Sequence, residues 1–424
     1  MRHARSSGVD MLSNLPCHIL ENILGCLDLR DAVRTSMLSK GWRYKWVRRP
    51  KLEFGNDEYL YIPQNPIPKT LIYQVLLLHE GPIMKFSLWG RYWRSCPDFD
   101  HWILFLSRKN VQEFTLQIGV GNIYHMPSHL FAFQQLRHLK LSSCVFHPPT
   151  TFIGFKKLTH IDFHTVTIVP ATFGDLISKC PLLEQLRLVA CTNFDCLEID
   201  AANLRCFYFI GVLKSICFKN TPKLEQVTVD FRLRVLADEF PVCSNLVKFF
   251  HHTPNLKQLN LDGGVLQYLT VGGLPESPPT ALNNVRDLNI SHMSFENIEE
   301  VVGAVYLITR CPRLQYFSMD ASIKNVEEAG VQFIKAQTNS YGGMKVLQKV
   351  CMLLIYGGLE PQTEFLRFIL SSAPALEEIY ILNHAFPDDQ VMQMIHEMKQ
   401  FPCPSRNVKF KYEELGTDIV MEVP

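Results

Sequence analysis

One hydrophobic pattern recurs through most of the chain. A leucine, or another large apolar residue, is followed three and five positions later by further apolar residues, as in Leu183-Glu184-Gln185-Leu186-Arg187-Leu188. The closing alternation has the two-residue period of a half-buried β-strand. In five copies a proline stands two residues before the leading leucine, after a stretch with helical spacing. Each copy therefore predicts a helix, a turn and a short strand.

The spacing of these copies predicts a repeat protein. The leading positions are 20 to 25 residues apart in the first half and 29 to 33 residues apart later. One strand and one helix of this length cannot bury their apolar face alone, but stacked copies can. The predicted fold class is α/β: an irregular leucine-rich-repeat solenoid over residues 71–343, with parallel strands on its concave face and helices outside. The leading positions are Phe114, Leu136, Leu158, Leu183, Leu204, Leu224, Leu256, Val285, Leu314, Leu347 and Leu376.

The middle residue of each strand motif is expected to face the concave surface, because the two-residue period sends both flanking residues inward. For any one position, a solvated strand residue without a partner is the simpler interpretation. For the group, a curved face about ten repeats wide favours a binding surface. The candidate residues of this binding surface are Lys140, Arg187, Thr228, Asn260, Asn289, Ser318 and Tyr380.

The first fifty residues carry a helical pattern instead. Pro16 fits the first turn of a helix, where its missing N–H costs nothing. A second short helix is predicted from Asp28, and a third from Ser39, with Trp42 and Trp46 one turn apart. Some forty residues cannot enclose so many large apolar side chains, so some must face a partner; the alternative is a helical cap on the solenoid. The first helix has one apolar face, formed by Leu15, Ile19, Leu20, Ile23, Leu24 and Leu27.

The strings Leu15-Pro16-x-x-Ile19-Leu20-x-x-Ile23-Leu24 and Leu38-Ser39-Lys40-x-Trp42-Arg43-x-x-Trp46 resemble an F-box, over residues 11–52. The resemblance implies docking on the Skp-type adaptor of a cullin–RING ubiquitin ligase. It also implies a set of adaptor-binding residues, of which Leu38, Trp42 and Trp46 support the interface. The implied residues are Leu15, Pro16, Ile19, Leu20, Ile23, Leu24, Leu38, Trp42 and Trp46.

Residues 344–413 resemble the FBD domain of plant F-box proteins. The string Phe401-Pro402-Cys403-Pro404-Ser405-Arg406 precedes a predicted closing strand at 408–412, although the family usually has an arginine where Cys403 stands. With the F-box and the repeats, the resemblance spans nearly the whole chain. The predicted organisation is a disordered N-terminus at 1–10, the F-box at 11–52, a proline-rich connector at 53–70, the solenoid at 71–343, the FBD segment at 344–413 and a tail at 414–424.

Charge and composition narrow the function further. Lysine and arginine number 42 against 41 acidic residues, so no overall field favours nucleic acid or an anionic membrane. No apolar run reaches the roughly 18 residues of a bilayer helix, and the first residues lack the apolar core of a secretory signal. A nuclear or cytoplasmic location is therefore expected. The thirteen cysteines contain no C-x-x-C pair and are predicted to be buried small hydrophobes.

Catalytic motifs are weak or incomplete. His396-Glu397-Met398-Lys399-Gln400 resembles a zincin motif, but Gln400 stands where the second histidine ligand must be. Gly119-Val120-Gly121-Asn122 lacks the third glycine of a dinucleotide-binding turn. We expect no cofactor, no metal and no enzymatic activity. The resemblance implies a substrate-receptor subunit of an SCF-type E3 ubiquitin ligase that binds an unknown protein substrate; the alternative is a leucine-rich-repeat scaffold without a ubiquitin role.

Overall fold

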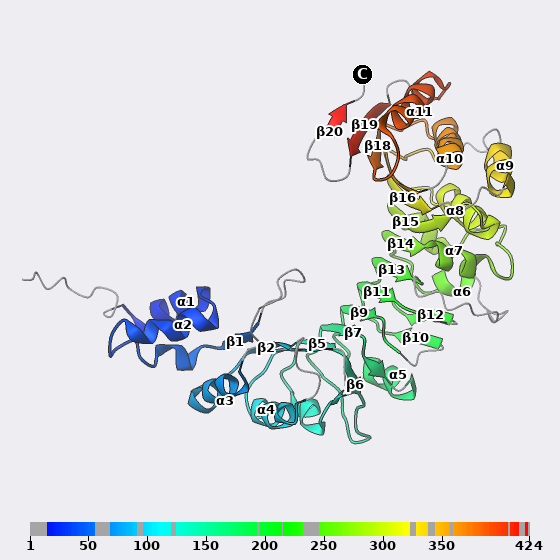
Figure 1. Ribbon diagram of the computed structural model, residues 1–424. Coiled ribbons are helices and arrows are strands. Elements are labelled where there is room, and N and C mark those ends of the chain that lie inside the picture. The colour runs from blue at the N-terminus through cyan, green and yellow to red at the C-terminus, as the bar shows by residue number, and fades with distance from the viewer. Residues whose placement is uncertain are drawn as a thin grey trace, which may run out of the picture. The chain divides into compact units, whose positions relative to one another are not determined.

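The computed structural model divides the chain into two compact units, Met1–Leu182 and Leu183–Pro424. The predictions for residues 1–10 and for most of the connector lie outside the described residues. Figure 1 labels the elements of both units. The structure describes residues 15–55, 68–90, 96–119, 124–168, 170–192, 196–213, 215–231, 246–322, 328–337, 344–356, 359–405, 408–414 and 420–422.

Unit 1 begins with a small helical packet at residues 15–50, called the N-terminal packet below. Its elements are α1 (Cys17–Cys26), α2 (Leu29–Arg34), η1 (Thr35–Met37) and η2 (Lys45–Arg48). Helix α1 starts at Cys17 with Pro16 as its N-cap residue, so Pro16 stands just before the first turn and not inside it as predicted. The Asp28 carboxylate accepts a hydrogen bond from the Asp31 backbone N–H at 2.7 Å, which caps α2.

The predicted third helix of the packet is wrong. The chain from Ser39 to Arg48 forms successive turns and the 3₁₀ helix η2. The Trp42 N–H donates to the Ser39 carbonyl at 3.1 Å, and the Lys45 N–H donates to the Trp42 carbonyl at 3.2 Å. These bonds join residues three apart, not four, so this backbone is wound more tightly than an α-helix.

The strands of unit 1 form one parallel sheet and one small parallel sheet. The main sheet is β1 (Lys51–Phe54), β2 (Lys85–Gly90), β3 (Glu113–Ile118), β5 (His138–Ser142) and β7 (His160–His164). The small sheet is β4 (Tyr124–His125), β6 (Cys144–Phe146) and β8 (Thr167–Ile168). Strand β1 crosses the predicted boundary between F-box and connector. The helices are α3 (Lys69–Leu78), α4 (Asp98–Leu106), η3 (Ser128–Ala132) and α5 (Pro170–Ser178).

Unit 2 is built in the same way with more repeats. Its parallel strands are β9 (Gln185–Val189), β11 (Cys206–Ile210), β13 (Gln226–Asp230), β14 (Gln258–Asp262), β15 (Asp287–Ser294), β16 (Tyr316–Ser322), β17 (Lys349–Tyr356), β18 (Glu378–Asn383) and β19 (Lys409–Glu414). Strand β20 (Val420–Glu422), from the predicted tail, pairs antiparallel with β19. A separate pair is β10 (Cys196–Asp200) and β12 (Ser215–Asn220).

The helices of unit 2 leave one face of its sheet open. They are α6 (Leu246–Phe250), α7 (Gly263–Thr270), η4 (Thr280–Asn284), α8 (Ile298–Arg310), α9 (Glu328–Gln337), α10 (Leu359–Ser372) and α11 (Asp388–Gln400). In Figure 1 the helices from α6 onward all lie on one side of the strands. The uncovered side is called the open face below. The predicted α/β repeat fold with parallel strands and outer helices is confirmed.

The core lies between the strands and the helices. The leading positions of the repeats are all almost completely buried, from Phe114 at 1% exposed to Leu376 at 1%. The strands alternate as predicted, with the two motif residues buried and the middle residue at least partly exposed. One alignment changes: Phe114 pairs with Leu139, not with Leu136. Phe114 is therefore equivalent to the second apolar residue of the next motif, and the leading position of the first repeat is three residues earlier than predicted.

The cysteine prediction holds for only part of the set. Among the eleven described cysteines, all of them free thiols, Cys96, Cys144, Cys180, Cys191 and Cys311 are buried. Burial raises the pKa of Cys180 to about 11 and that of Cys311 to about 12, so these thiols stay protonated. The others are partly or fully exposed; five of them stand at helix or strand positions, and Cys403 lies in the loop between α11 and β19. These other cysteines are Cys26, Cys196, Cys206, Cys217, Cys351 and Cys403.

Candidate functional site

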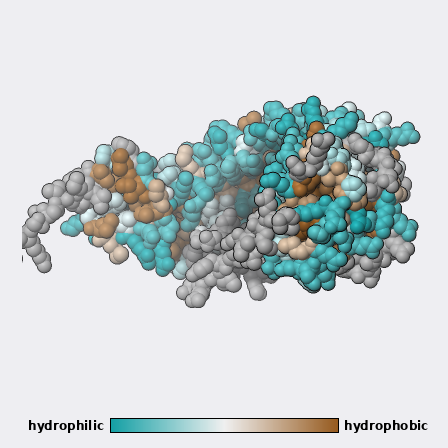
Figure 2. Space-filling model, turned by 90° about the horizontal axis from the view of Figure 1, so that it is seen from above, coloured by the Kyte–Doolittle hydropathy of each residue, from teal (hydrophilic) through white to brown (hydrophobic). Residues whose placement is uncertain are grey.

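The N-terminal packet exposes several large apolar side chains. The side chains of Ile19 and Ile23 on α1 are 38% and 37% exposed, and that of Leu38 is 64% exposed. Pro16 is exposed and Leu15 half-buried. Figure 2 shows apolar surface gathered over this packet. We call Leu15, Pro16, Ile19, Ile23, Met37 and Leu38 the packet surface; Met37, 82% exposed, was missed by the site prediction although it directly precedes Leu38.

Other predicted adaptor-binding residues lie in the core of the packet instead. Leu20 and Leu24 are 3% and 2% exposed, so the prediction that they line a contact surface is corrected. Each follows an exposed isoleucine by one residue, and this step around α1 turns its side chain into the packet. Trp42 and Trp46 are also almost fully buried and form part of the packet core. Leu38 was predicted to support it and is on the surface.

The packet is joined to the first repeat through a buried arginine and histidine. The Arg49 guanidinium donates to the Leu27 carbonyl, and burial lowers its pKa. The His79 Nε2 lies 2.8 Å from the Arg49 carbonyl, which can only accept, so this nitrogen carries the proton. The Glu80 N–H donates to the Val47 carbonyl at 2.9 Å. These contacts hold the packet against the end of α3 within unit 1.

In unit 1, Lys140 stands in a row of partly exposed strand positions whose neighbours along each strand are buried or face the core. Thr115, Lys140 and Asp162 are register partners on β3, β5 and β7. The Lys140 ammonium lies 3.5 Å from the Asp162 carboxylate and 5.1 Å from the ring centroid of Trp89. The lysine is therefore held by an acidic and an aromatic neighbour.

In unit 2, the six other predicted substrate-binding residues fall in a single row. Strand register places them side by side, at positions where the flanking residues are buried. The prediction missed three members of this row, Tyr208, Cys351 and Lys411, although each is the middle residue of an apolar-x-apolar strand motif. The complete row is Arg187, Tyr208, Thr228, Asn260, Asn289, Ser318, Cys351, Tyr380 and Lys411.

The two ends of this row are charged. The Arg187 guanidinium lies 3.9 Å from the centroid of the Tyr208 ring. At the other end, the Lys411 ammonium donates to the Tyr380 hydroxyl at 2.7 Å and to the Glu378 carboxylate at 3.0 Å. Hydrogen bonds from Lys349 and Lys411 lower the pKa of Glu378 to about 2, so it is ionised at neutral pH.

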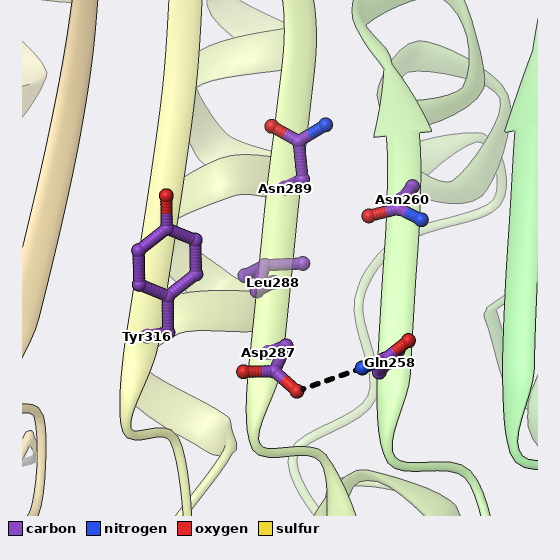
Figure 3. A pocket seen from close by; sticks show the side chains of 6 residues that line it. All are labelled: Gln258, Asn260, Asp287, Leu288, Asn289 and Tyr316. Atoms are coloured by element: carbon purple, nitrogen blue, oxygen red, sulfur yellow. Dashed lines mark hydrogen bonds between the residues drawn. The ribbon is translucent and has the colours of Figure 1, made fainter.

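The middle of the row is hollowed and almost uncharged. A depression of about 290 Å³ is lined by Gln258, Asn260, Asp287, Leu288, Asn289 and Tyr316. Figure 3 shows these side chains on the neighbouring strands β14, β15 and β16. The Gln258 amide donates to the Asp287 carboxylate at 3.3 Å.

Of the catalytic candidates in the sequence, residues 120–122 of the glycine turn lie outside the described residues, and the His396 candidate lies on α11. His396 and Gln400 lie one turn apart on α11, and the Gln400 amide donates to the His396 Nε2 at 2.9 Å. Among the described residues, no group of three histidine, cysteine, aspartate or glutamate side chains is placed to hold a metal ion. No helix within the described ranges has both the length and the apolar character needed to cross a membrane.

Comparisons with known proteins agree with the N-terminal packet and the repeats. The F-box domain profile matches residues 12–53, and the profile described as FBD-associated F-box protein At5g56370, LRR repeats, matches residues 99–260. The F-box/FBD/LRR-repeat protein At1g13570 of Arabidopsis thaliana is 35% identical over 406 residues, covering 93% of this chain and 96% of that protein. The chain therefore belongs to the F-box/FBD/LRR-repeat family.

More distant matches share some of these domain names. The putative F-box/LRR-repeat protein At3g18150 of Arabidopsis thaliana is 25% identical over 348 residues, covering 75% of this chain and 73% of that protein. A solved leucine-rich-repeat protein of Leptospira interrogans covers 90% of this chain and 97% of its own, at 14% identity and a TM-score of 0.39. A TM-score that low does not establish a shared fold.

Proposed function

We propose that this protein is the substrate-receptor subunit of an SCF-type E3 ubiquitin ligase. The packet surface binds the Skp-type adaptor, and the open face of the repeats binds a target protein. The observation that carries the proposal is the packet itself: its core is already filled by Leu20, Leu24 and the two tryptophans, yet Ile19, Ile23, Met37 and Leu38 remain in solvent. Exposed apolar side chains gathered on so small a packet mark a protein–protein contact.

In this role the protein does no covalent chemistry. It holds a target near the ubiquitin-loaded enzyme that the rest of the ligase recruits, so target lysines meet that enzyme at high effective concentration. Residues 344–413, assigned here to the FBD segment, contribute β17, α10, β18, α11 and β19 to unit 2. We therefore propose that this segment belongs to the target-binding part of the protein.

A binding measurement with a purified Skp-type adaptor tests the adaptor half of the proposal. Each buried apolar anchor contributes about 2 kcal/mol in a typical interface. The double substitution Ile19→Ala/Leu38→Ala should therefore weaken adaptor binding by roughly a thousandfold, since 1.4 kcal/mol is about tenfold. The melting temperature should change little because both side chains are exposed.

The matched control is Ile153→Ala/Leu182→Ala, which removes an exposed isoleucine and an exposed leucine outside the packet. This control should bind the adaptor like the wild type. Equal affinity of the wild type and the Ile19/Leu38 double variant would remove the assignment of the packet surface. Failure of the wild type to bind any Skp-type adaptor would favour the scaffold alternative.

A further inference from the structure

The hollow in the middle of the unit 2 row differs from both ends of that row. Arg187 stands at one end, and Lys349, Glu378 and Lys411 stand at the other. The six residues that line the hollow comprise three side-chain amides, one carboxylate, one tyrosine and one leucine, and none of the six is a cation. Its one formal charge, Asp287, already accepts a hydrogen bond from Gln258. The hollow is therefore unsuited to a phosphate or a carboxylate.

Two asparagines in the hollow each have one end of the side-chain amide in a hydrogen bond to a neighbouring strand, and the other end can bind a ligand. The Asn260 Nδ2 donates to the Thr228 hydroxyl at 2.9 Å, which leaves the Asn260 Oδ1 as an acceptor. The Ser318 hydroxyl donates to the Asn289 Oδ1 at 2.6 Å, which leaves the Asn289 NH₂ group as a donor. Both asparagines are only partly exposed, so an apolar occupant would leave these groups unpaired, which is costly.

The free acceptor and the free donor stand on adjacent strands. Asn260 and Asn289 are register partners on β14 and β15, and neighbouring strands lie about 4.8 Å apart. Figure 3 shows Asn260 on β14, Asn289 on β15 and the Tyr316 ring on β16, the strand on the far side of Asn289 from Asn260. A ligand that satisfies both must offer a hydrogen-bond donor and an acceptor on the same side. A primary amide does this, whereas a trans peptide bond points its N–H and C=O in opposite directions.

We propose that this hollow recognises the primary amide of an asparagine or glutamine side chain in a loop of the target protein. The amide N–H donates to the Asn260 Oδ1, its carbonyl accepts from the Asn289 Nδ2, and the Tyr316 ring packs against the apolar part of the loop. The inference rests on the proposed function, because it assumes that the open face of unit 2 is where the target binds. It predicts target recognition without a phosphate.

The test is selection of a phage-displayed library of random twelve-residue peptides on the immobilised full-length chain. The enriched peptides should share an asparagine or glutamine, and replacing that residue with alanine should weaken binding at least tenfold. Asn260→Leu/Asn289→Leu, which keeps side-chain size and removes both amides, should weaken the same peptides at least tenfold. Asn110→Leu, an exposed asparagine of unit 1, is the control and should bind them like the wild type.

A second variant shows whether the loss of peptide binding comes from the missing amides or from misfolding of the double variant. Asn289→Asp keeps the shape and removes the donor, so it should also lose the selected peptides while its melting temperature stays near that of the wild type. Enrichment of no peptide, of peptides with an acidic consensus, or of peptides that bind both variants unchanged would overturn the inference. Adaptor binding by the same preparations reports separately on the proposed function, and it should be identical in all variants.

Discussion

Directly after the strands β5, β7 and β9, a single residue that is not glycine adopts a left-handed backbone conformation. Ser143, Thr165 and Ala190 have φ values of 55°, 53° and 49°. The Ser143 N–H donates to the His164 carbonyl at 3.0 Å, and the Ala190 N–H donates to the Ile210 carbonyl at 2.6 Å. Each bond continues the ladder to the next strand. The conformation costs about 1–2 kcal/mol for a residue with a Cβ, and these bonds compensate for it.

Ala190→Gly should therefore stabilise the protein. Glycine has no Cβ and adopts this conformation without strain, so the free energy of unfolding should rise by about 0.5–1 kcal/mol after the greater backbone entropy of glycine is subtracted. Urea unfolding measures the change. The control is Ala132→Gly, at the exposed end of the helix η3, which should lower stability by a similar amount. A loss of stability in both variants would contradict the strain at Ala190.

His79 should make the stability of unit 1 depend on pH. Burial lowers the pKa of this imidazole below the 6.5 of an unfolded chain, and its Nδ1 has no hydrogen-bond partner among the described residues. As pH falls, the unfolded state takes up the proton first. Stability contributed by the neutral ring is therefore complete above about pH 6.5 and is lost as pH falls below it.

The variant His79→Gln has no titrating group at this position and can still donate to the Arg49 carbonyl. Unfolding free energies measured between about pH 7 and pH 5 should fall more steeply for the wild type than for this variant. Parallel pH profiles would show that the buried histidine does not titrate in this range.

At the scale of the element, helix α1 divides its apolar residues between two roles. Ile19 and Leu20 are adjacent in sequence, yet the first is 38% exposed and the second 3%. Helical periodicity alone places all six apolar residues on one broad face. Which part of that face packs inward depends on where α2 and the two tryptophans lie. The sequence therefore predicts the helix and its apolar face, and only the packing separates contact residues from core residues.

Substituting these neighbours should separate stability from binding. Leu20→Ala should lower the free energy of unfolding by about 2–5 kcal/mol, the usual cost of emptying a buried leucine site. Ile19→Ala should cost under about 1 kcal/mol in stability and should weaken adaptor binding instead. Thermal unfolding and adaptor titration on the same preparations measure both. A large stability loss for Ile19→Ala would place that residue in the core.

The repeat strands are the elements that the sequence predicts best. The apolar-x-x-apolar-x-apolar motif sets both the strand and the inward residues, so the row from Arg187 to Tyr380 could be predicted before its register was known. The left-handed turns could not, because neither Ser143 nor Ala190 is a residue type that signals φ above zero. The third packet helix failed because Gly41 and the tight turns around it override the spacing of the tryptophans.

At the scale of the whole molecule, the account assigns different partners to different surfaces. The packet surface belongs to unit 1, and the row with its hollow belongs to unit 2. The sequence indicates this division, since a helical motif of about forty residues precedes a long repeat region. The donors and acceptors that the hollow offers could not be predicted from the sequence. They depend on the hydrogen bonds that orient the Asn260 and Asn289 side chains.

The most direct test of the central claim is amide hydrogen exchange of the full-length chain with and without a Skp-type adaptor, read by mass spectrometry. Exchange should slow on adaptor binding over residues 15–48, where the packet surface lies, and should stay unchanged over strands β9 to β19 of unit 2. Protection that appears on the unit 2 strands instead, or no protection within residues 15–48 at saturating adaptor, would contradict the account.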